Sequence, residues 1–130
     1  MTASLHETIL KDCKPIFQKK YGDAYDDSYA WGPVTDKEFY NVMFKNFRTR
    51  KGVPYGLRLT SVGNSMLQRV YEGYSYHING DINHMVVVQL DQHMEWPYYV
   101  GRKVATFYNS NDAAWFRLNS NDLKLYTEHL

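Results

Sequence analysis

The chain has a single cysteine and no long hydrophobic run, and each shortage excludes a class of protein. Because Cys13 has no second cysteine to pair with, no internal disulfide can form, which suits a reducing cytosol. No apolar stretch approaches the roughly 18 residues of a membrane span, and the first residues lack the basic start and apolar run of a signal peptide. We therefore expect a soluble cytoplasmic protein with no membrane partner.

Motifs for catalysis or cofactor binding are also missing. The sequence holds no glycine-rich phosphate loop, no paired-cysteine zinc site and no HExxH helix. The group nearest to a metal site, His77 with Asp81 and His84, has no recognised ligand spacing. Cys13 with His6 as its base is better explained by apolar packing of the thiol. We expect neither an enzyme nor a bound cofactor or metal.

The apolar content is sufficient for one folded domain. The 130 residues are 44% hydrophobic and 16% aromatic. A chain of this length buries roughly two-thirds of its unfolded surface, so its stability needs neither a disulfide nor a metal. No repeat, low-complexity tract or linker divides the sequence, and we expect a single domain over residues 1–130.

Capping residues predict two helices in the first part of the chain. Ser4 and Glu7 form a capping box for a helix that begins near Leu5, and Pro15 must kink or end this helix. Residues 35–38 form a second capping box, followed by apolar residues at helical spacing as far as Phe47. Residues 22–33 are predicted to form a loop.

The middle of the chain mixes helical and strand patterns. Residues 57–59 alternate like a short strand, and a helix is expected from Thr60 or Ser61 to about Glu72. Residues 74–78 before Asn79-Gly80 suggest a hairpin. The apolar residues of segment 81–95 instead follow helical spacing, with Asp81 as cap, and we favour that helix.

The last part of the chain predicts a hairpin and a final helix. Residues 104–108 and 114–118 are strand-like runs around the turn-forming segment 109–112. Ser120 is expected to cap a helix that runs toward Leu130.

This order of elements is typical of an α+β fold of the winged helix-turn-helix type. A helix, a short strand, two helices and a hairpin follow one another over residues 35–118. Residues 1–34 would then be an N-terminal extension of helix and loop, and residues 119–130 a C-terminal helix. The link over residues 73–81 is longer than the three or four residues usual in the motif.

Two short stretches of sequence resemble a known group of proteins. Residues 56–63, Gly-Leu-Arg-Leu-Thr-Ser-Val-Gly, and segments within residues 90–100 are similar to small uncharacterised proteins of tailed bacteriophages. The likeness covers roughly the C-terminal two-thirds of the chain. It implies a phage-encoded protein made in a bacterial cytoplasm, where such proteins bind DNA, regulate transcription or block a host machine.

Charge is unevenly distributed although the net charge is only +1. Residues 39–71 contain six basic residues and no acid, whereas residues 70–101 contain four acids and no lysine or arginine. A domain polarised in this way can place its basic side on phosphates or against a charged protein. A solvated basic helix end is the alternative explanation.

The basic residues predict a surface that binds double-stranded DNA and serves to regulate transcription or replication. The expected phosphate contacts are Lys45, Arg48, Arg50, Lys51, Arg58, Arg102 and Lys103. If all engaged, log affinity would fall with log salt at a slope of about −6. Gln89 and Gln92 are expected to read base edges, although Asp91 and Glu95 in the same segment would repel phosphates.

A protein-interaction module that inhibits or redirects a host factor is the second hypothesis. Aromatic side chains with polar tips are common at protein interfaces and also stack on unpaired bases. Trp96, Tyr98 and Tyr99 are the candidates for an exposed aromatic surface of this kind.

Overall fold

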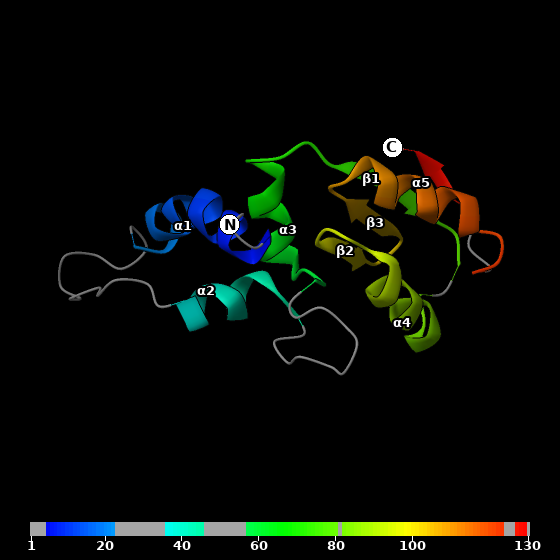
Figure 1. Ribbon diagram of the computed structural model, residues 1–130, viewed down its shortest axis with the longest axis horizontal. Helices are drawn as coiled ribbons and strands as arrows, with labels where there is room; N and C mark the ends of the chain where they lie inside the picture. The colour runs from blue at the N-terminus through cyan, green and yellow to red at the C-terminus, as the bar shows by residue number, and fades with distance from the viewer. Residues whose placement is uncertain (1–4, 23–35, 46–56, 81, 124–126, 130) are drawn as a thin grey trace.

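The computed structural model describes residues 5–22, 36–45, 57–80, 82–123 and 127–129, which form a mixed α+β structure (Figure 1). The elements in chain order are α1 (Leu5–Gly22), α2 (Asp36–Met43), α3 (Ser61–Gln68), β1 (Tyr74–Ile78), α4 (His84–His93), β2 (Tyr98–Gly101), β3 (Val104–Phe107), α5 (Ser110–Asn119) and β4 (Thr127–His129). The predicted α+β class is confirmed. None of these described helices combines the length and apolar character needed to cross a bilayer.

The strands form one antiparallel sheet in the order β2-β3-β1-β4. Strands β2 and β3 make a hairpin in which Gly101 lies opposite Val104. Strand β1 pairs with β3 on one side and with the short edge strand β4 on the other. An element from the middle of the chain therefore occupies an interior position in the sheet.

Helices α1, α2 and α3 lie together at one end of the molecule, and the sheet with α4 and α5 lies at the other (Figure 1). We call the buried residues that pack around α1–α3 the helical cluster; it also contains Leu59 and Tyr108, and Tyr99 packs against it. On α1 they recur at helical spacing as Ile9, Cys13 and Phe17. Gly63 lets α3 approach the end of α2, since a Cβ there would lie 2.2 Å from the carbonyl oxygen of Met43.

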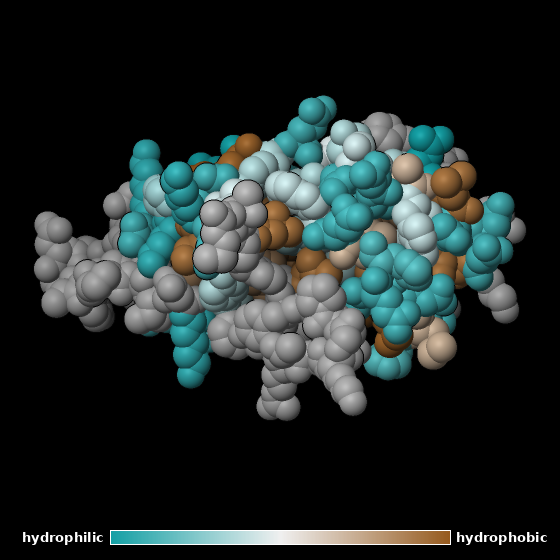
Figure 2. All heavy atoms as spheres, viewed as in Figure 1, coloured by the Kyte–Doolittle hydropathy of each residue, from teal (hydrophilic) through white to brown (hydrophobic). Residues whose placement is uncertain are grey.

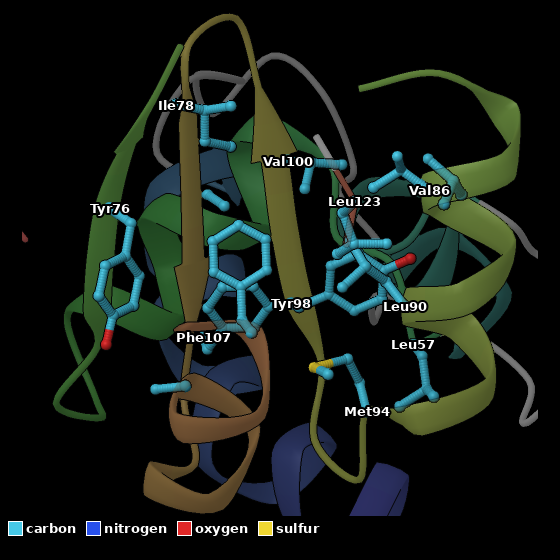
Figure 3. Close-up of a cluster of buried hydrophobic side chains, with 14 residues drawn as sticks. Leu57, Tyr76, Ile78, Val86, Leu90, Met94, Tyr98, Val100, Phe107 and Leu123 are labelled. Carbon is cyan, nitrogen blue, oxygen red and sulfur yellow. The ribbon is translucent and has the colours of Figure 1, made fainter. Parts of the chain in front are cut away.

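The second group of buried residues, the sheet cluster, lies between the sheet and helices α4 and α5. In Figure 3, Val86 and Leu90 of α4 face Val100 and Tyr98 of β2. The alternation of side chains along β2 explains this arrangement, because Tyr98 and Val100 point to the same face of the sheet. Residues at helical spacing on α4 cover that face.

The segment 74–88 resolves into a strand followed by a helix. The favoured helix is confirmed as α4, although it starts at His84 with Asn83 as its cap, and Asp81 lies outside the described residues. The Asn83 side chain accepts a hydrogen bond from the backbone N–H of Val86 at 3.1 Å. Residues 74–78 do form a strand, but it pairs with β3 and β4 rather than with Val86–Val88.

The hairpin predicted over residues 104–118 is wrong, because its second half is helix α5. Asn109, expected in a turn, is the N-cap of α5, and its side chain accepts a hydrogen bond from the N–H of Asn111 at 2.8 Å. Ala113 and Phe116 are buried at helical spacing. The hairpin of this region is instead β2–β3.

The predicted C-terminal helix is also wrong. Ser120 follows the end of α5 as its C-cap, and its hydroxyl donates to the carbonyl of Arg117 at 3.0 Å. Strand β4 then pairs with β1, so that Ile78 lies opposite Thr127. The open edge of β1 thereby gains hydrogen-bonding partners that a helix would not have supplied.

The other helices follow the predictions with changed ends. Helix α1 continues through Pro15 to Gly22, and α3 begins after the predicted cap Thr60 but ends at Gln68. Helix α2 ends at Met43, and Phe47 and the predicted cap at Thr35 lie outside the described residues. The order of elements differs from that expected for a winged helix at two points. Strand β1 lies between α3 and α4, and helix α5 occupies the position of the expected second wing strand.

Candidate nucleic-acid interface

The outer edge of β2 forms backbone hydrogen bonds with residues 57–59. The N–H of Tyr98 donates to the carbonyl of Leu57 at 3.0 Å, and the N–H of Leu59 donates to the carbonyl of Tyr98 at 2.7 Å. The N–H of Lys45 donates to the carbonyl of Arg58 at 2.8 Å. These bonds bring the end of α2, residues 57–59 and β2 together, although they are far apart in the sequence.

Lys45 and Arg58 form one basic pair at this edge. The Lys45 ammonium lies 5.6 Å from the centre of the Tyr99 ring, within the range of a cation–π contact. Partial burial lowers the pKa of Lys45 below its ordinary value, and the positive charge of Arg58 lowers it further. Two cations held this close repel each other, and an anion placed between them would relieve the repulsion.

The Arg58 side chain carries a buried donor without an acceptor in the described part of the chain. Its Nε atom is buried and makes no hydrogen bond among the described residues. A buried donor without an acceptor costs about 1–3 kcal/mol. The described residues therefore leave one donor of the Arg58 guanidinium unsatisfied.

Arg102 and Lys103 form the second basic pair, in the turn between β2 and β3. Both are exposed. Lys103 has a φ of 61°, in the left-handed region that favours glycine. A lysine there costs backbone energy that a glycine would not. Strain of this kind is concentrated at functional sites, where the side chain is worth its conformational cost.

Tyr99 lies between the two basic pairs. It points to the same face of β2 as Gly101, and a Cβ at Gly101 would lie 2.3 Å from the Tyr99 hydroxyl oxygen. The missing side chain of Gly101 thus lets the tyrosine ring lie along the strand. The ring extends from the Lys45 ammonium toward the turn.

We call these five residues the basic strip: Lys45, Arg58, Tyr99, Arg102 and Lys103. Strand β2 rises by about 3.3 Å per residue, so the two basic pairs lie about 10 Å apart along the strand. The structure brings four of the seven predicted cations to the two ends of β2. Arg48, Arg50 and Lys51 lie outside the described residues.

The predicted base-reading glutamines are separate from the basic strip. Gln89 and Gln92 are exposed on α4. Helix α4 covers the face of the sheet into which Tyr98 points, whereas Tyr99 packs against the helical cluster. Gln89 and Gln92 are therefore separated by the sheet from Lys45.

The two acids expected to repel phosphates, Asp91 and Glu95, differ in their exposure. Asp91 is 3% exposed and accepts a hydrogen bond from the hydroxyl of Tyr98, so its charge does not lie on the outer face of α4. Glu95 is exposed beyond the end of the helix. The local sequence pattern does not distinguish these two acids, because Asp91 is buried through its contact with Tyr98 of β2.

The predicted aromatic surface is only partly available. The expectation that Tyr98 is exposed is wrong, since it is fully buried in the sheet cluster, where the alternation of β2 directs it. Trp96 is half-buried and packs edge-to-face on Tyr71, with ring centres 5.6 Å apart. Tyr99 is half-buried beneath Lys45.

No catalytic or metal-binding arrangement stands out in the described part of the chain. Groups of three or more His, Cys, Asp or Glu side chains suited to a metal ion do not occur among these residues. Burial raises the pKa of the Cys13 thiol to about 11, with a smaller contribution from Asp12. A thiol with this pKa is a packing group and a poor nucleophile.

Comparison with protein-family models, with curated protein sequences and with solved structures finds no match for this chain.

Proposed function

We propose that this protein is a small DNA-binding domain that holds the phosphate backbone of double-stranded DNA through the basic strip. The observation that carries the proposal is the placement of two basic pairs at the two ends of β2, with the Tyr99 ring between them. The proposed activity is binding alone, with no catalytic step and no cofactor.

The state of the individual cations supports an anionic ligand. Lys45 is held beside the like charge of Arg58. A phosphate bridging the Lys45 ammonium and the Arg58 guanidinium would reduce the repulsion between these two cations. Lys103 occupies a backbone position better suited to glycine, which is consistent with selection for its charge.

The contacts expected from this arrangement are to phosphates rather than to bases. Phosphate contacts fix position and supply affinity, whereas sequence is read at base edges. Gln89 and Gln92 lie on the other side of the sheet from Lys45, so we do not assign them a shared binding face with the strip. We propose that binding through the strip is largely independent of sequence.

The winged-helix and phage hypotheses supply two parts of this proposal, the role of one hairpin and the biological setting. The wing of a winged helix is a β-hairpin whose turn reaches the DNA, and the β2–β3 hairpin with Arg102 and Lys103 would serve that purpose here. A role in transcription or replication within a phage-infected bacterium is the biological setting we propose for it.

The test is fluorescence anisotropy of a labelled random-sequence duplex, titrated with protein at low and then moderate salt. Four engaged cations predict a log–log salt slope of about −3.6. The double variant Arg102→Gln with Lys103→Gly should reduce the magnitude of the slope by about 1.8 and weaken binding about tenfold or more. These losses should be similar for unrelated duplex sequences.

The matched control removes two exposed lysines from α1, as Lys11→Gln with Lys19→Gln. It lowers the net charge by the same amount at the opposite end of the molecule (Figure 1). Equal weakening by both double variants would show that only overall charge matters. Absence of binding at low salt would overturn the proposal.

The alternative, a module that binds a host protein, has less support from the surface. On the face seen in Figure 2, hydrophobic side chains form small patches between hydrophilic ones. Met85 and Leu118 are exposed large hydrophobic residues, at 65% and 82% exposure. Single exposed residues of this kind are ordinary on soluble proteins, whereas extended patches mark protein interfaces. We therefore favour DNA binding through the basic strip over a protein-binding surface.

A further inference from the structure

A groove outside the basic strip runs between β1 and α5. It has a volume of about 420 Å³, within the range of small-molecule sites. It is lined by Tyr74, Tyr76, Ser110, Ala113, Ala114 and Arg117. Tyr76 and Ala113 belong to the sheet cluster, whereas Ser110, Ala114 and Arg117 are exposed and are not explained by core packing or by the proposed binding of DNA.

The helix side of the groove has a small-residue centre and polar ends. Ser110, Ala113, Ala114 and Arg117 lie at positions i, i+3, i+4 and i+7 of α5 and so share one face of the helix. Ser110 belongs to the first turn, and Arg117 follows two turns later, about 10 Å along the axis. The alanines leave space between these ends that larger side chains would fill.

The strand side of the groove is aromatic. Tyr74 and Tyr76 are two residues apart on β1 and point to the same face of the sheet. Tyr76 is held in place by its neighbours, with its ring centre 5.8 Å from that of Phe116 and 6.2 Å from that of Phe107. The groove thus has a fixed aromatic wall opposite a wall of alanines.

A single cation provides the charge of the groove. Burial raises the pKa of Tyr76, while the positive charge of Arg117 opposes the rise and Tyr74 adds to it, so the three polar groups lie close together. Among the described residues, no carboxylate forms an ion pair with Arg117. A guanidinium offers two parallel N–H donors that match a carboxylate or a phosphate.

We propose that this groove binds a small aromatic anion, with the ring against Tyr74 and Tyr76 over the alanines and the anionic group on Arg117. Stacked or edge-to-face rings favour a flat aromatic body in such a space. The arginine fork selects a negative group at one end. A carboxylate and a phosphate share this chemistry, and the experiment distinguishes them.

The experiment is a titration followed by ¹H–¹⁵N correlation spectra of the full chain. The probes are benzoate, phenyl phosphate, benzyl alcohol and inorganic phosphate. Benzoate or phenyl phosphate should produce saturable shifts centred on the amides of the groove residues. The better of these two probes identifies the preferred anion. Benzyl alcohol lacks the charge and inorganic phosphate lacks the ring, so both should bind at least about tenfold more weakly.

Two variants test the two halves of the site. Arg117→Gln removes the charge and should weaken binding of the better probe about tenfold or more. Ala114→Leu keeps a good helix former at an exposed position but fills the groove, and should weaken binding by a similar factor. Lys11→Gln on α1 is the charge control and should bind as the wild type does. Spectra of each free variant verify the fold.

The proposal is overturned by any of three results. The first is the absence of saturable shifts at the groove amides with either anion. The second is equal affinity in wild type and Arg117→Gln. The third is inorganic phosphate or benzyl alcohol binding as tightly as the aromatic anions.

Discussion

The hydroxyl group of Tyr98 in β2 donates a hydrogen bond to the carboxylate of Asp91 in α4, and both side chains are buried. The other carboxylate oxygen of Asp91 has no hydrogen-bond partner among the described residues. Among the described residues, the hydrogen bond from Tyr98 is thus the one that offsets the free-energy cost of burying this carboxylate. It fastens α4 to the sheet and keeps an acidic charge away from the outer surface of the helix.

Tyr98→Phe should therefore destabilise the protein by about 1–3 kcal/mol, because the buried carboxylate loses a donor while the ring packing stays. Urea denaturation measures the free energy of unfolding. Tyr99→Phe is the matched control, since its ring lies half-buried beneath Lys45, and its effect should stay within about 0.5 kcal/mol. Equal stability of the two variants would contradict a role of the Asp91 bond in stability.

Lys103→Gly should stabilise the protein by up to about 1 kcal/mol. The lysine has a φ of 61°, and a glycine adopts that conformation without the steric cost of a Cβ. Greater freedom of glycine in the unfolded chain offsets part of the gain. Thermal unfolding measures the change, with Arg102→Gly at the neighbouring position as control. A destabilised Lys103→Gly would show that the turn is not strained.

Gly63→Ala should destabilise the protein by about 1–3 kcal/mol, although alanine is the better helix former. The added Cβ would lie 2.2 Å from the carbonyl oxygen of Met43 and 2.8 Å from its Cα, and backbone atoms cannot turn aside as a side chain can. Ser65→Ala, at an exposed position of the same helix, is the control. Stability above that of the wild type would contradict the close contact of α2 and α3.

Cys13 should be almost unreactive toward thiol reagents in the folded protein. With a pKa of about 11, only about one thiol in a thousand is ionised at pH 8, and the side chain is fully buried. Labelling with a chromogenic disulfide reagent should be slow in buffer and fast in denaturant. Rapid labelling without denaturant would show that the α1–α3 packing opens easily.

Asp112 should make stability depend on pH in the acidic range. Its carboxylate accepts hydrogen bonds from the N–H groups of Glu95 and Trp96 at 3.0 and 2.9 Å. Burial nevertheless raises its pKa above the ordinary 3.8, against the effect of those bonds, and Glu95 adds to the rise. Between the ordinary and the raised pKa the folded protein binds more protons than the unfolded chain, so stability falls as pH rises.

The variant Asp112→Asn isolates this effect. It should be less stable than the wild type, because an amide cannot accept from both N–H groups with two oxygens. The stability advantage of the wild type should shrink as pH rises from about 3 to about 7, and urea unfolding at several pH values measures it. An advantage that grows over this range would reverse the expected sign.

Local patterns predicted the helices whose ends are set by their own residues. Thr60 caps α3, and its hydroxyl accepts from the N–H of Gly63 at 2.9 Å, as a capping residue at that position should. Asn109 caps α5 in the same way, yet its neighbours Asn111 and Asp112 also suit a turn, and Trp115 and Phe116 suit a strand. The packing of α5 on the sheet decides between helix, turn and strand for this segment, and a local sequence pattern does not contain that information.

Long-range pairing explains what the sequence did not predict of the fold and the site. Strand β4 has three residues and exists because β1 offers it an edge. Lys45 and Tyr99 meet because residues 57–59 pair with β2, so their contact has no counterpart in local spacing. The sequence singled out the basic residues, but the arrangement of Lys45, Arg58, Arg102 and Lys103 about one strand required the structure.

Within the described residues, the chain passes between the helical cluster and the sheet cluster within one or two residues at several places. Among them are Leu57 to Leu59, Tyr98 to Tyr99, and Phe107 to Tyr108. A shift of β2 by one residue would exchange the sides of its whole set of side chains and damage both clusters together. The two ends of the molecule are therefore coupled in unfolding, and hydrogen exchange should find the slowest amides on both sides of β2 opening in a single cooperative event.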